Sequence, residues 1–177
     1  KREAKKSAMF LDRDGIINED FGYVFEPAEF VFQDGIFELV TRANKAGMLV
    51  IVVTNQSGIA RGYYTDEQFQ ILSKWMGAKF LEKNAHIDDV FYCPHHPTEG
   101  KSSLTQSCDC RKPEIGMFLN AAAKHNIDLS SSIMVGDKLS DMKAATKAGL
   151  RSNFWLDHTA SIEMLDIVDV SQTHIKI

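Results

Sequence analysis

Two carboxylates stand one residue apart where a short apolar run ends. The run extends from Ala8 to Leu11, and Asp12-Arg13-Asp14-Gly15 follows it directly. An apolar run that stops at polar residues is typical of a buried strand that delivers side chains to a sheet edge, where open α/β sheets bind ligands. Carboxylates this close repel each other unless a cation such as Mg²⁺ lies between them. The pattern therefore indicates a metal site in which Asp12 stays ionised as a nucleophile and Asp14 exchanges protons.

Taken alone, such a tetrapeptide is more often a simple turn, so the interpretation depends on motifs farther along the chain. The apolar, β-branched run 48–53 is typical of a strand buried on both faces, and Thr54-Asn55-Gln56-Ser57 comes directly after it. A hydroxyl at this position can donate to a phosphoryl oxygen. Ordinary turn chemistry explains the segment equally well on its own.

A third carboxylate comes after the apolar run 133–135. Gly136-Asp137 would bring an oxygen ligand to the same sheet edge, completing the oxygen shell of the metal. Asp141, one helical turn later, could hydrogen-bond Lys138 or a metal-bound water. Read in isolation, this segment would be a strand-to-helix turn with a capping aspartate. The joint occurrence of these motifs in one chain favours phosphoryl chemistry over separate turns.

The chain's three cysteines all lie within residues 93–110, in the tight pairs Cys93-x-His95 and Cys108-x-Cys110. Three thiolates and one imidazole make a closed tetrahedral zinc site with no position left for water. The polar loop between the pairs has little core of its own and needs such a staple. His96 competes with His95 as a ligand, and the alternative is a set of reduced, buried cysteines. We predict a structural zinc bound by Cys93, His95, Cys108 and Cys110.

Arg111-Lys112-Pro113 comes immediately after the predicted zinc ligands. Clamping the loop would fix where these two cations point, and a fixed pair of cations recognises a phosphate or a developing oxyanion. The alternative is a solvated basic pair at a helix start. Positive charge there is unfavourable to the helix dipole, which favours the functional interpretation.

Strands alternate with helical patterns along the chain. Helical spacing runs from Gly35 to Gly47, and Thr65 begins a capping box ahead of a second, long helix. Further strands are expected at 90–92, 133–135 and 153–156, with a helix at 138–148 and a weak helical patch at 162–167. The buried face of the long helix is expected to be Phe69, Leu72, Met76 and Phe80.

This alternation predicts parallel strands joined by right-handed crossovers. We therefore expect residues 1–177 to form a single α/β domain, a three-layer Rossmann-like parallel sheet with helices on both faces and a zinc-binding loop. The segment between Asp14 and Thr54 has room only for a loop, a helix and a strand. No large cap domain is expected, so loops must supply specificity.

Length and composition set further bounds. The chain has 177 residues, 44% of them hydrophobic, which is enough for one well-packed domain. A net charge of -4 disfavours a nucleic-acid partner but not a small anionic substrate. No apolar run reaches the roughly 20 residues of a membrane helix, and the basic start lacks the apolar stretch of a signal peptide. We expect a monomeric, cytoplasmic protein with no membrane partner.

Together these motifs resemble those of the haloacid dehalogenase superfamily of phosphatases. The superfamily usually has threonine after the glycine of the first motif, where this chain has Ile16, so one hydroxyl contact is missing. The resemblance implies Mg²⁺ held by Asp12, Asp137 and the main-chain carbonyl of Asp14. It also implies catalytic roles for Asp12, Asp14, Thr54 and Lys112. The matching residues are Asp12-x-Asp14-Gly15, Thr54, Lys112 and Gly136-Asp137-x-x-x-Asp141.

A narrower resemblance, to the heptose bisphosphate phosphatases and their histidinol phosphatase relatives, covers Met9 to about Gly149. It is carried by residues 53–62, by the cysteine and histidine pairs, and by residues 110–113. Residues 18–24 are similar to the heptose enzymes, whose matching loop contacts the sugar. The resemblance implies a small phosphorylated sugar as substrate, a heptose 1,7-bisphosphate that loses its C7 phosphate through an aspartyl phosphate, in nucleotide-activated heptose biosynthesis. The implied substrate-binding residues are Asp20, Gly22, Tyr23, Asn55, Gln56, Ser57, Arg111 on the far phosphate, and Lys138.

Other functions remain open at this point. A histidinol phosphate phosphatase would use the same chemistry on a cationic substrate, for which Arg111 is a liability. A zinc-stapled interaction module with a degenerate site would need no catalysis, although every expected catalytic position is filled. A phosphatase for nucleic-acid ends would fit an open site, but the acidic balance and the lack of an aromatic and basic groove speak against it.

Overall fold

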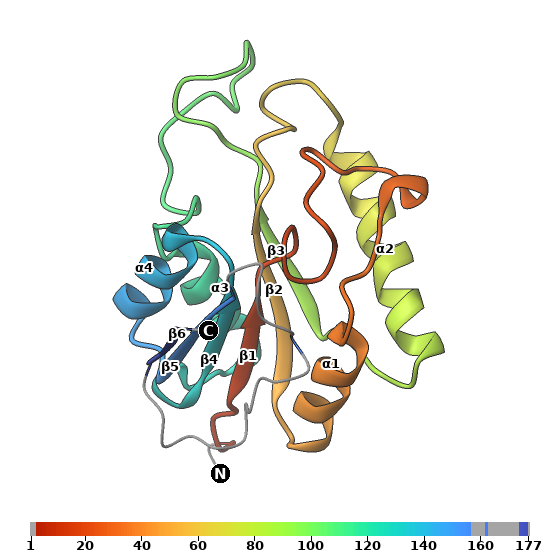
Figure 1. The fold of residues 1–177 in the computed structure, drawn as a ribbon. Coiled ribbons are helices and arrows are strands. Elements are labelled where there is room, and N and C mark those ends of the chain that lie inside the picture. The colour runs from red at the N-terminus through yellow and green to blue at the C-terminus, as the bar shows by residue number, and fades with distance from the viewer. Residues whose placement is uncertain (1–2, 157–161, 163–173, 177) are drawn as a thin grey trace.

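The computed structural model describes residues 3–156, 162 and 174–176. Within them the chain forms a six-stranded, parallel sheet in the order β3-β2-β1-β4-β5-β6 (Figure 1). The chain moves outward from β1 to β3 and then crosses back to β4, so the strand order reverses beside β1. Such a reversal opens a crevice at the carboxyl ends of the strands. The strands are β1 (Ala8–Leu11), β2 (Leu49–Asn55), β3 (Asp89–Cys93), β4 (Ile133–Gly136), β5 (Ser152–Trp155) and β6 (His174–Lys176).

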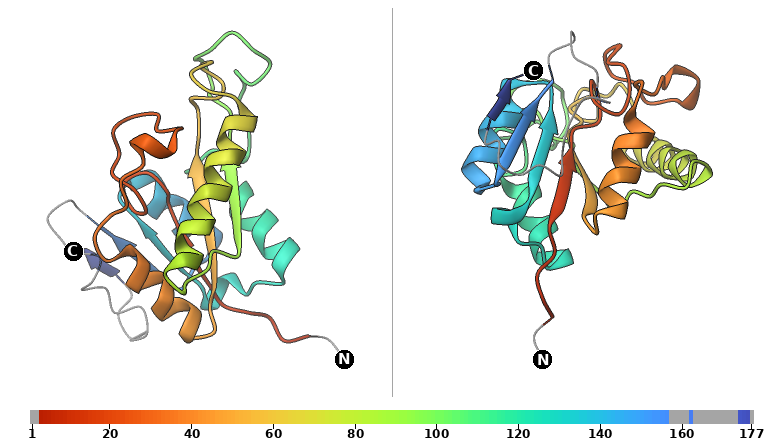
Figure 2. Two further views of the ribbon diagram at one scale, coloured as in Figure 1. Left: turned by 90° about the vertical axis from the view of Figure 1, so that its right-hand side faces the viewer. Right: turned by 60° about the horizontal axis from the view of Figure 1, so that its bottom comes forward.

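The helices cover both faces of this sheet. Helices α1 (Ile36–Lys45) and α2 (Asp66–Glu82) lie on one face, and α3 (Gly116–His125) and α4 (Leu139–Ala148) lie on the other (Figures 1 and 2). The three-layer parallel fold predicted from the sequence is therefore confirmed. None of the helices in the described residues has both the length and the apolar character needed to cross a bilayer.

Strand β1 shows why the sheet needs two helical layers. Its side chains alternate between the faces, so Met9 and Leu11 pack in the cluster that includes α1 and α2, while Ala8 and Phe10 pack in the cluster that includes α3 and α4. None of the four is accessible to solvent. The ring of Phe10 contacts that of Phe118 on α3, with centroids 4.9 Å apart. A strand with apolar residues on both faces can end in functional side chains only at its tip.

Most sequence predictions of helices and strands are confirmed. The capping box is present, because Gln68 N donates to Thr65 Oγ1 at 3.1 Å and Thr65 N donates to Gln68 Oε1 at 2.9 Å. The predicted buried face of α2 is also correct. Strand β6 was not predicted, and residues 163–167 of the expected helical patch lie outside the described residues.

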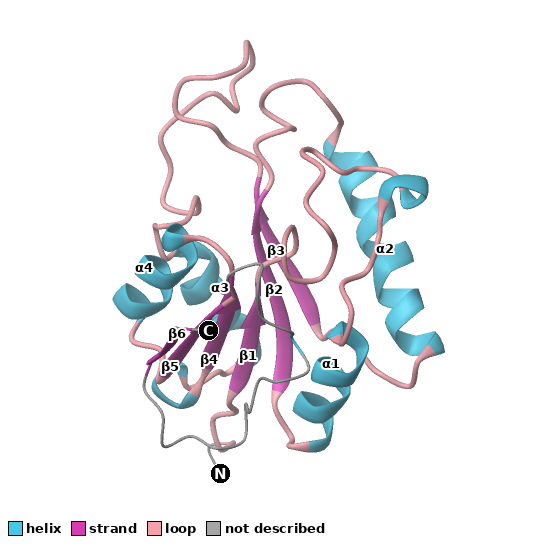
Figure 3. Ribbon diagram, viewed as in Figure 1, coloured by secondary structure: helices cyan, strands magenta, loops and turns pink. Residues whose placement is uncertain are grey.

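Long loops gather at the carboxyl edge of the sheet (Figure 3). The loop after β1 contains one 3-10 turn (Pro27–Glu29) before α1, and the loop after β3 extends to α3. The latter loop rests on the segment after β2, since Ala60 N donates to Pro94 O at 3.2 Å. A Cβ on Gly100 would lie 2.1 Å from Ala60 O, so only glycine permits this approach. The loop after β3 and the segment after β2 therefore pack against each other.

Replacing Phe118 by Ala should lower the free energy of unfolding by about 3–5 kcal/mol, because it empties a fully buried site between α3 and β1. The matched control is Leu119→Ala on the same helix, where the side chain is 50% exposed and the loss should stay below about 1 kcal/mol. Urea unfolding monitored by circular dichroism measures both. Equal losses in the two variants would contradict the assignment of α3 to the core.

Candidate active site

Three carboxylates meet at the crevice beside β1. Asp12 follows β1 and Asp137 follows β4, the parallel strand paired with it, while Asp141 lies in the first turn of α4. Oxygen atoms of the three side chains lie within 4.8 Å of one another. Hard oxygen donors at this spacing fit Mg²⁺. A Cβ on Gly15 would lie 2.0 Å from Asp137 Oδ2, so the glycine of the first motif makes room for this carboxylate.

The buried Lys112 ammonium joins this cluster. Its Nζ donates to Asp12 Oδ1 at 2.9 Å, to Asp141 Oδ1 at 2.6 Å and to the carbonyl of Val53 at 2.8 Å. Burial raises the pKa of Asp12 to about 7, against the opposing effect of the Lys112 charge. Burial also acts to lower the pKa of Lys112, but the carboxylates of Asp12 and Asp141 outweigh it and raise that pKa above its ordinary value. The lysine is therefore a fixed cation.

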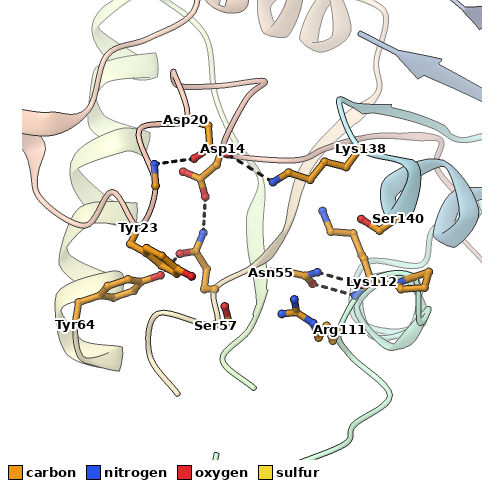
Figure 4. Close-up of a pocket in the computed structure, with 13 residues that line it drawn as sticks. Asp14, Asp20, Tyr23, Asn55, Ser57, Tyr64, Arg111, Lys112, Lys138 and Ser140 are labelled. Carbon is orange, nitrogen blue, oxygen red and sulfur yellow. Dashed lines mark hydrogen bonds and ion pairs between the residues drawn. The ribbon is translucent and has the colours of Figure 1, made fainter. Parts of the chain in front are cut away.

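Asn55 holds the backbone that carries this lysine. Its Oδ1 accepts from Lys112 N at 2.9 Å and its Nδ2 donates to Lys112 O at 3.1 Å, as the dashed lines in Figure 4 show. The end of β2 thus clamps the loop after β3. Asn55 was predicted to bind substrate, and it lines the cavity as well as making this clamp.

The Asp14 carboxylate is held apart from the other three. Its Oδ1 accepts from the Arg13 guanidinium at 2.9 Å and from Asn18 Nδ2 at 3.0 Å, and its Oδ2 accepts from Gln56 Nε2 at 3.0 Å. Burial acts to raise the pKa of Asp14, but these donors and the Arg13 charge bring it below its ordinary value. Ile16, where the superfamily usually has threonine, is buried in the core. Asn18 and Gln56 supply donors to Asp14 instead.

A cavity of about 610 Å³ opens beside these groups (Figure 4). Asp12 and Thr54 are only 4% and 1% exposed, and they connect to it through Lys112 and Gln56, which contact them and line it. All of the predicted substrate-binding residues line this cavity. The full lining is Asp14, Asp20, Gly22, Tyr23, Asn55, Gln56, Ser57, Tyr64, Arg111, Lys112, Pro113, Lys138 and Ser140.

Two contacts place cationic groups at this cavity. Lys138 Nζ lies 3.7 Å from Asp20 Oδ2, which links the start of α4 to the loop after β1. Arg111 Nη1 donates to the carbonyl of His95 at 3.5 Å, so its position depends on the cysteine loop. Tyr64 and Ser140 were not predicted to belong to this site. Tyr64 precedes the capping box of α2, and nothing in that pattern indicates which way its side chain points.

The cysteine loop brings its predicted ligands together. Cys93 Sγ lies 3.6 Å from both His95 Nδ1 and Cys108 Sγ, while Cys110 Sγ lies 3.2 Å from His95 Nδ1, 3.5 Å from Cys108 Sγ and 2.6 Å from Cys93 Sγ. Sulfur ligands about 2.3 Å from a tetrahedral zinc would be roughly 3.7 Å apart. Most of the distances between the four ligand atoms are close to that value, so the donor set and its spacing are compatible with zinc. His96 lies outside the cluster, and its Nδ1 accepts from Thr98 N and Glu99 N.

Comparisons with known proteins agree with this geometry. Residues 109–167 match a family model described as HAD-hydrolase-like. The D-glycero-beta-D-manno-heptose-1,7-bisphosphate 7-phosphatase of Vibrio cholerae is 48% identical over 145 residues, which are 82% of this chain and 78% of the relative. The enzyme of the same name from Escherichia coli strain K12 is 48% identical over 143 residues, 81% of this chain and 75% of the relative.

A solved structure with the same fold contains ligands. The D,D-heptose 1,7-bisphosphate phosphatase from B. bronchiseptica, complexed with magnesium and phosphate, superimposes with a TM-score of 0.74 at 33% identity. The match covers 84% of this chain and 79% of that structure.

Replacing Lys112 by Met should lower the free energy of unfolding by about 3–5 kcal/mol at pH 8 in EDTA, because two buried carboxylates lose their cation. The folded-state pKa of Asp12 is already above its ordinary value, and it rises further without the ammonium. The folded state then binds more protons than the unfolded state, and stability falls as pH rises. The loss of unfolding free energy caused by Lys112→Met should therefore be smaller at pH 5 than at pH 8.

The matched control is Lys124→Met, which removes a 61% exposed side chain paired with Asp89. Its cost should stay below about 1 kcal/mol at both pH values. Urea unfolding at the two pH values measures both variants. A Lys112→Met deficit that does not change with pH would contradict the pairing of Lys112 with Asp12 and Asp141.

Proposed function

The chain belongs to the D-glycero-beta-D-manno-heptose-1,7-bisphosphate 7-phosphatase family of HAD-like hydrolases, and from this premise we propose that it removes the C7 phosphate of that bisphosphate. The observation that carries the proposal is the meeting of Asp12, Asp137, Asp141 and Lys112 near the strand ends, beside a cavity of about 610 Å³. The proposed product is a heptose 1-phosphate for nucleotide-activated heptose synthesis.

Asp12 is the proposed nucleophile. One carboxylate oxygen attacks the C7 phosphorus in line, and the bond from phosphorus to the sugar oxygen breaks to leave an aspartyl phosphate. Lys112 supports this role because its ammonium favours the ionised form of Asp12, although burial opposes ionisation. Asp12, Asp137 and the main-chain carbonyl of Asp14 would hold Mg²⁺, which supplies positive charge against the transferring phosphoryl group. Asp141 fixes Lys112 and the start of α4.

Asp14 is the proposed proton carrier. In its protonated form, which its hydrogen-bond donors disfavour by lowering its pKa, it donates a proton to the departing sugar oxygen. The resulting carboxylate then takes a proton from the water that attacks the aspartyl phosphate. Its carboxyl group lines the cavity and is held by Arg13, Asn18 and Gln56, away from the metal-ligating carboxylates. Thr54 and Lys112 provide donors to the phosphoryl oxygens.

We assign substrate specificity to the residues that line the cavity. Arg111 is proposed to bind the far phosphate, because a planar guanidinium can make two parallel hydrogen bonds to it. Asp20, Tyr23 and Ser57 line the same cavity and are proposed to contact sugar hydroxyls. A second phosphate on the substrate makes Arg111 useful, whereas the ammonium group of histidinol phosphate would be repelled by it.

The cysteine cluster is proposed to bind a structural zinc through Cys93, His95, Cys108 and Cys110. Support comes from the closed set of donors and from the contact between Arg111 and the carbonyl of His95. The zinc would take no part in chemistry, because four protein ligands leave no open position. Its effect on turnover would act through the placement of Arg111 and Lys112.

The function is tested by phosphate release in Mg²⁺ from the β and α anomers of heptose 1,7-bisphosphate and from histidinol phosphate. The β anomer should have the highest kcat/KM, and Asp12→Asn should lower turnover by more than about a thousandfold because it removes the nucleophile. Circular dichroism and urea unfolding show whether the variant is folded. Preference for histidinol phosphate would overturn the substrate assignment. A folded Asp12→Asn variant with about a tenth of wild-type activity would overturn the covalent scheme.

Replacing Cys110 by Ser should remove zinc, because it breaks a four-ligand set, and should speed amide hydrogen exchange in residues 94–110. Turnover should fall with it, since Arg111 and Lys112 lose their support. The matched control is His96→Ala, which removes a neighbouring imidazole outside the cluster and should keep one zinc per chain. Elemental analysis measures the zinc content of both variants, and hydrogen-exchange mass spectrometry measures the exchange of residues 94–110. Retention of zinc in Cys110→Ser or its loss in His96→Ala would refute the ligand set.

A further inference from the structure

Gln56 connects Tyr64 to two of the proposed catalytic side chains. Its Nε2 donates to Asp14 Oδ2 at 3.0 Å and to Thr54 Oγ1 at 2.8 Å. Its Oε1 accepts a hydrogen bond from the Tyr64 hydroxyl on the other side. Tyr64 is only 4% exposed, and it lines the same cavity (Figure 4). The donors and acceptors thus run in one direction, from the tyrosine to Asp14 and Thr54.

The ring of Tyr64 is held in place from two sides. Phe25 stacks on it, with centroids 5.4 Å apart and ring planes within 11°. A Cβ on Gly58 would lie 2.2 Å from Tyr64 Cε1, so the ring is packed directly against this glycine. Burial raises the pKa of Tyr64, which keeps the hydroxyl protonated near neutral pH. Tyr64 is therefore a fixed hydrogen-bond donor.

A fixed donor decides which way the Gln56 amide faces. The two ends of an amide have nearly the same shape, but one accepts hydrogen bonds and the other donates them. If the amide were reversed, its oxygen would face the Asp14 carboxylate and its NH₂ group would face the tyrosine hydroxyl. The amide oxygen and the Asp14 carboxylate would then both be acceptors, and the Tyr64 hydroxyl proton would lose its acceptor in a buried site, where an unmatched polar group is costly.

On the basis of the proposed function, we propose that Tyr64 is a positioning residue that orients the Gln56 amide so that it donates to Asp14 and Thr54 together. Asp14 is then held where it can reach the leaving oxygen. Because Thr54 Oγ1 accepts from Gln56, its own proton points elsewhere. That proton reaches the Asn55 carbonyl, at 3.5 Å, and a phosphoryl oxygen could replace this long contact. Tyr64 acts on the reaction through Gln56 and makes no contact with the transferring phosphoryl group.

The test is a double-mutant cycle with Tyr64→Phe, Gln56→Met and the double variant, each assayed with heptose bisphosphate and with p-nitrophenyl phosphate. Tyr64→Phe should lower kcat about tenfold and change KM by less than about twofold, because the ring remains and only the orienting hydroxyl is lost. Gln56→Met should lower kcat at least as much. The double variant should match Gln56→Met, since the hydroxyl has no amide left to orient.

Tyr92→Phe is the matched control, because it also removes a hydrogen-bonded hydroxyl, one that contacts Asp66 and Gln70 on α2. It should keep wild-type kcat, and urea unfolding should show Tyr64→Phe folded. Unchanged kcat in Tyr64→Phe, a rise in KM alone, or losses that multiply in the double variant would each overturn the proposal. If the wild-type protein hydrolysed p-nitrophenyl phosphate but not heptose bisphosphate, the substrate assignment would be refuted. The double-mutant cycle could still be measured with p-nitrophenyl phosphate.

Discussion

The structure depends on one buried ammonium group. Lys112 Nζ lies within hydrogen-bonding distance of Asp12, Asp141 and the carbonyl of Val53, with almost no access to solvent. A buried charge is tolerated only when it is paired and hydrogen-bonded. Satisfying this one group therefore requires the ends of β1 and β2, the start of α4 and the loop after β3 to meet. The same meeting places Asp12, the proposed nucleophile, beside a cation at the reversal point of the sheet.

Lys112 itself does not come from a strand end, so its placement needs separate support. Asn55 clamps its backbone from the end of β2, and the cysteine cluster closes the loop that precedes it. This loop packs on the segment after β2 through Leu104 and Gly100 and has little core of its own. A bound metal would compensate for that small core, because its four ligands meet only in the folded loop and the free energy of metal binding then adds to the free energy of folding. The predicted zinc would therefore also support the position of Lys112.

Much of this arrangement could be predicted from the sequence. Buried strands that end in Asp12, Thr54 and Asp137 must bring these residues to one edge, because parallel strands share their direction. The partners of Asp14 could not be predicted in this way. Asn18 and Gln56 reach it through loop conformations, and the role of Tyr64 depends on packing against Phe25 and Gly58. Pairing of Lys112 with Asp141 likewise depends on side-chain directions that spacing alone does not give.

The central claim is that Asp12, paired with the Lys112 ammonium, acts as a nucleophile that becomes covalently phosphorylated. Rapid quenching during turnover of the bisphosphate, followed by borohydride reduction and peptide mass spectrometry, tests it most directly. An aspartyl phosphate at position 12 would be reduced to homoserine, so homoserine is expected in the peptide that contains Leu11 and Arg13. Homoserine at another aspartate, or its absence from all peptides during active turnover, would contradict the account.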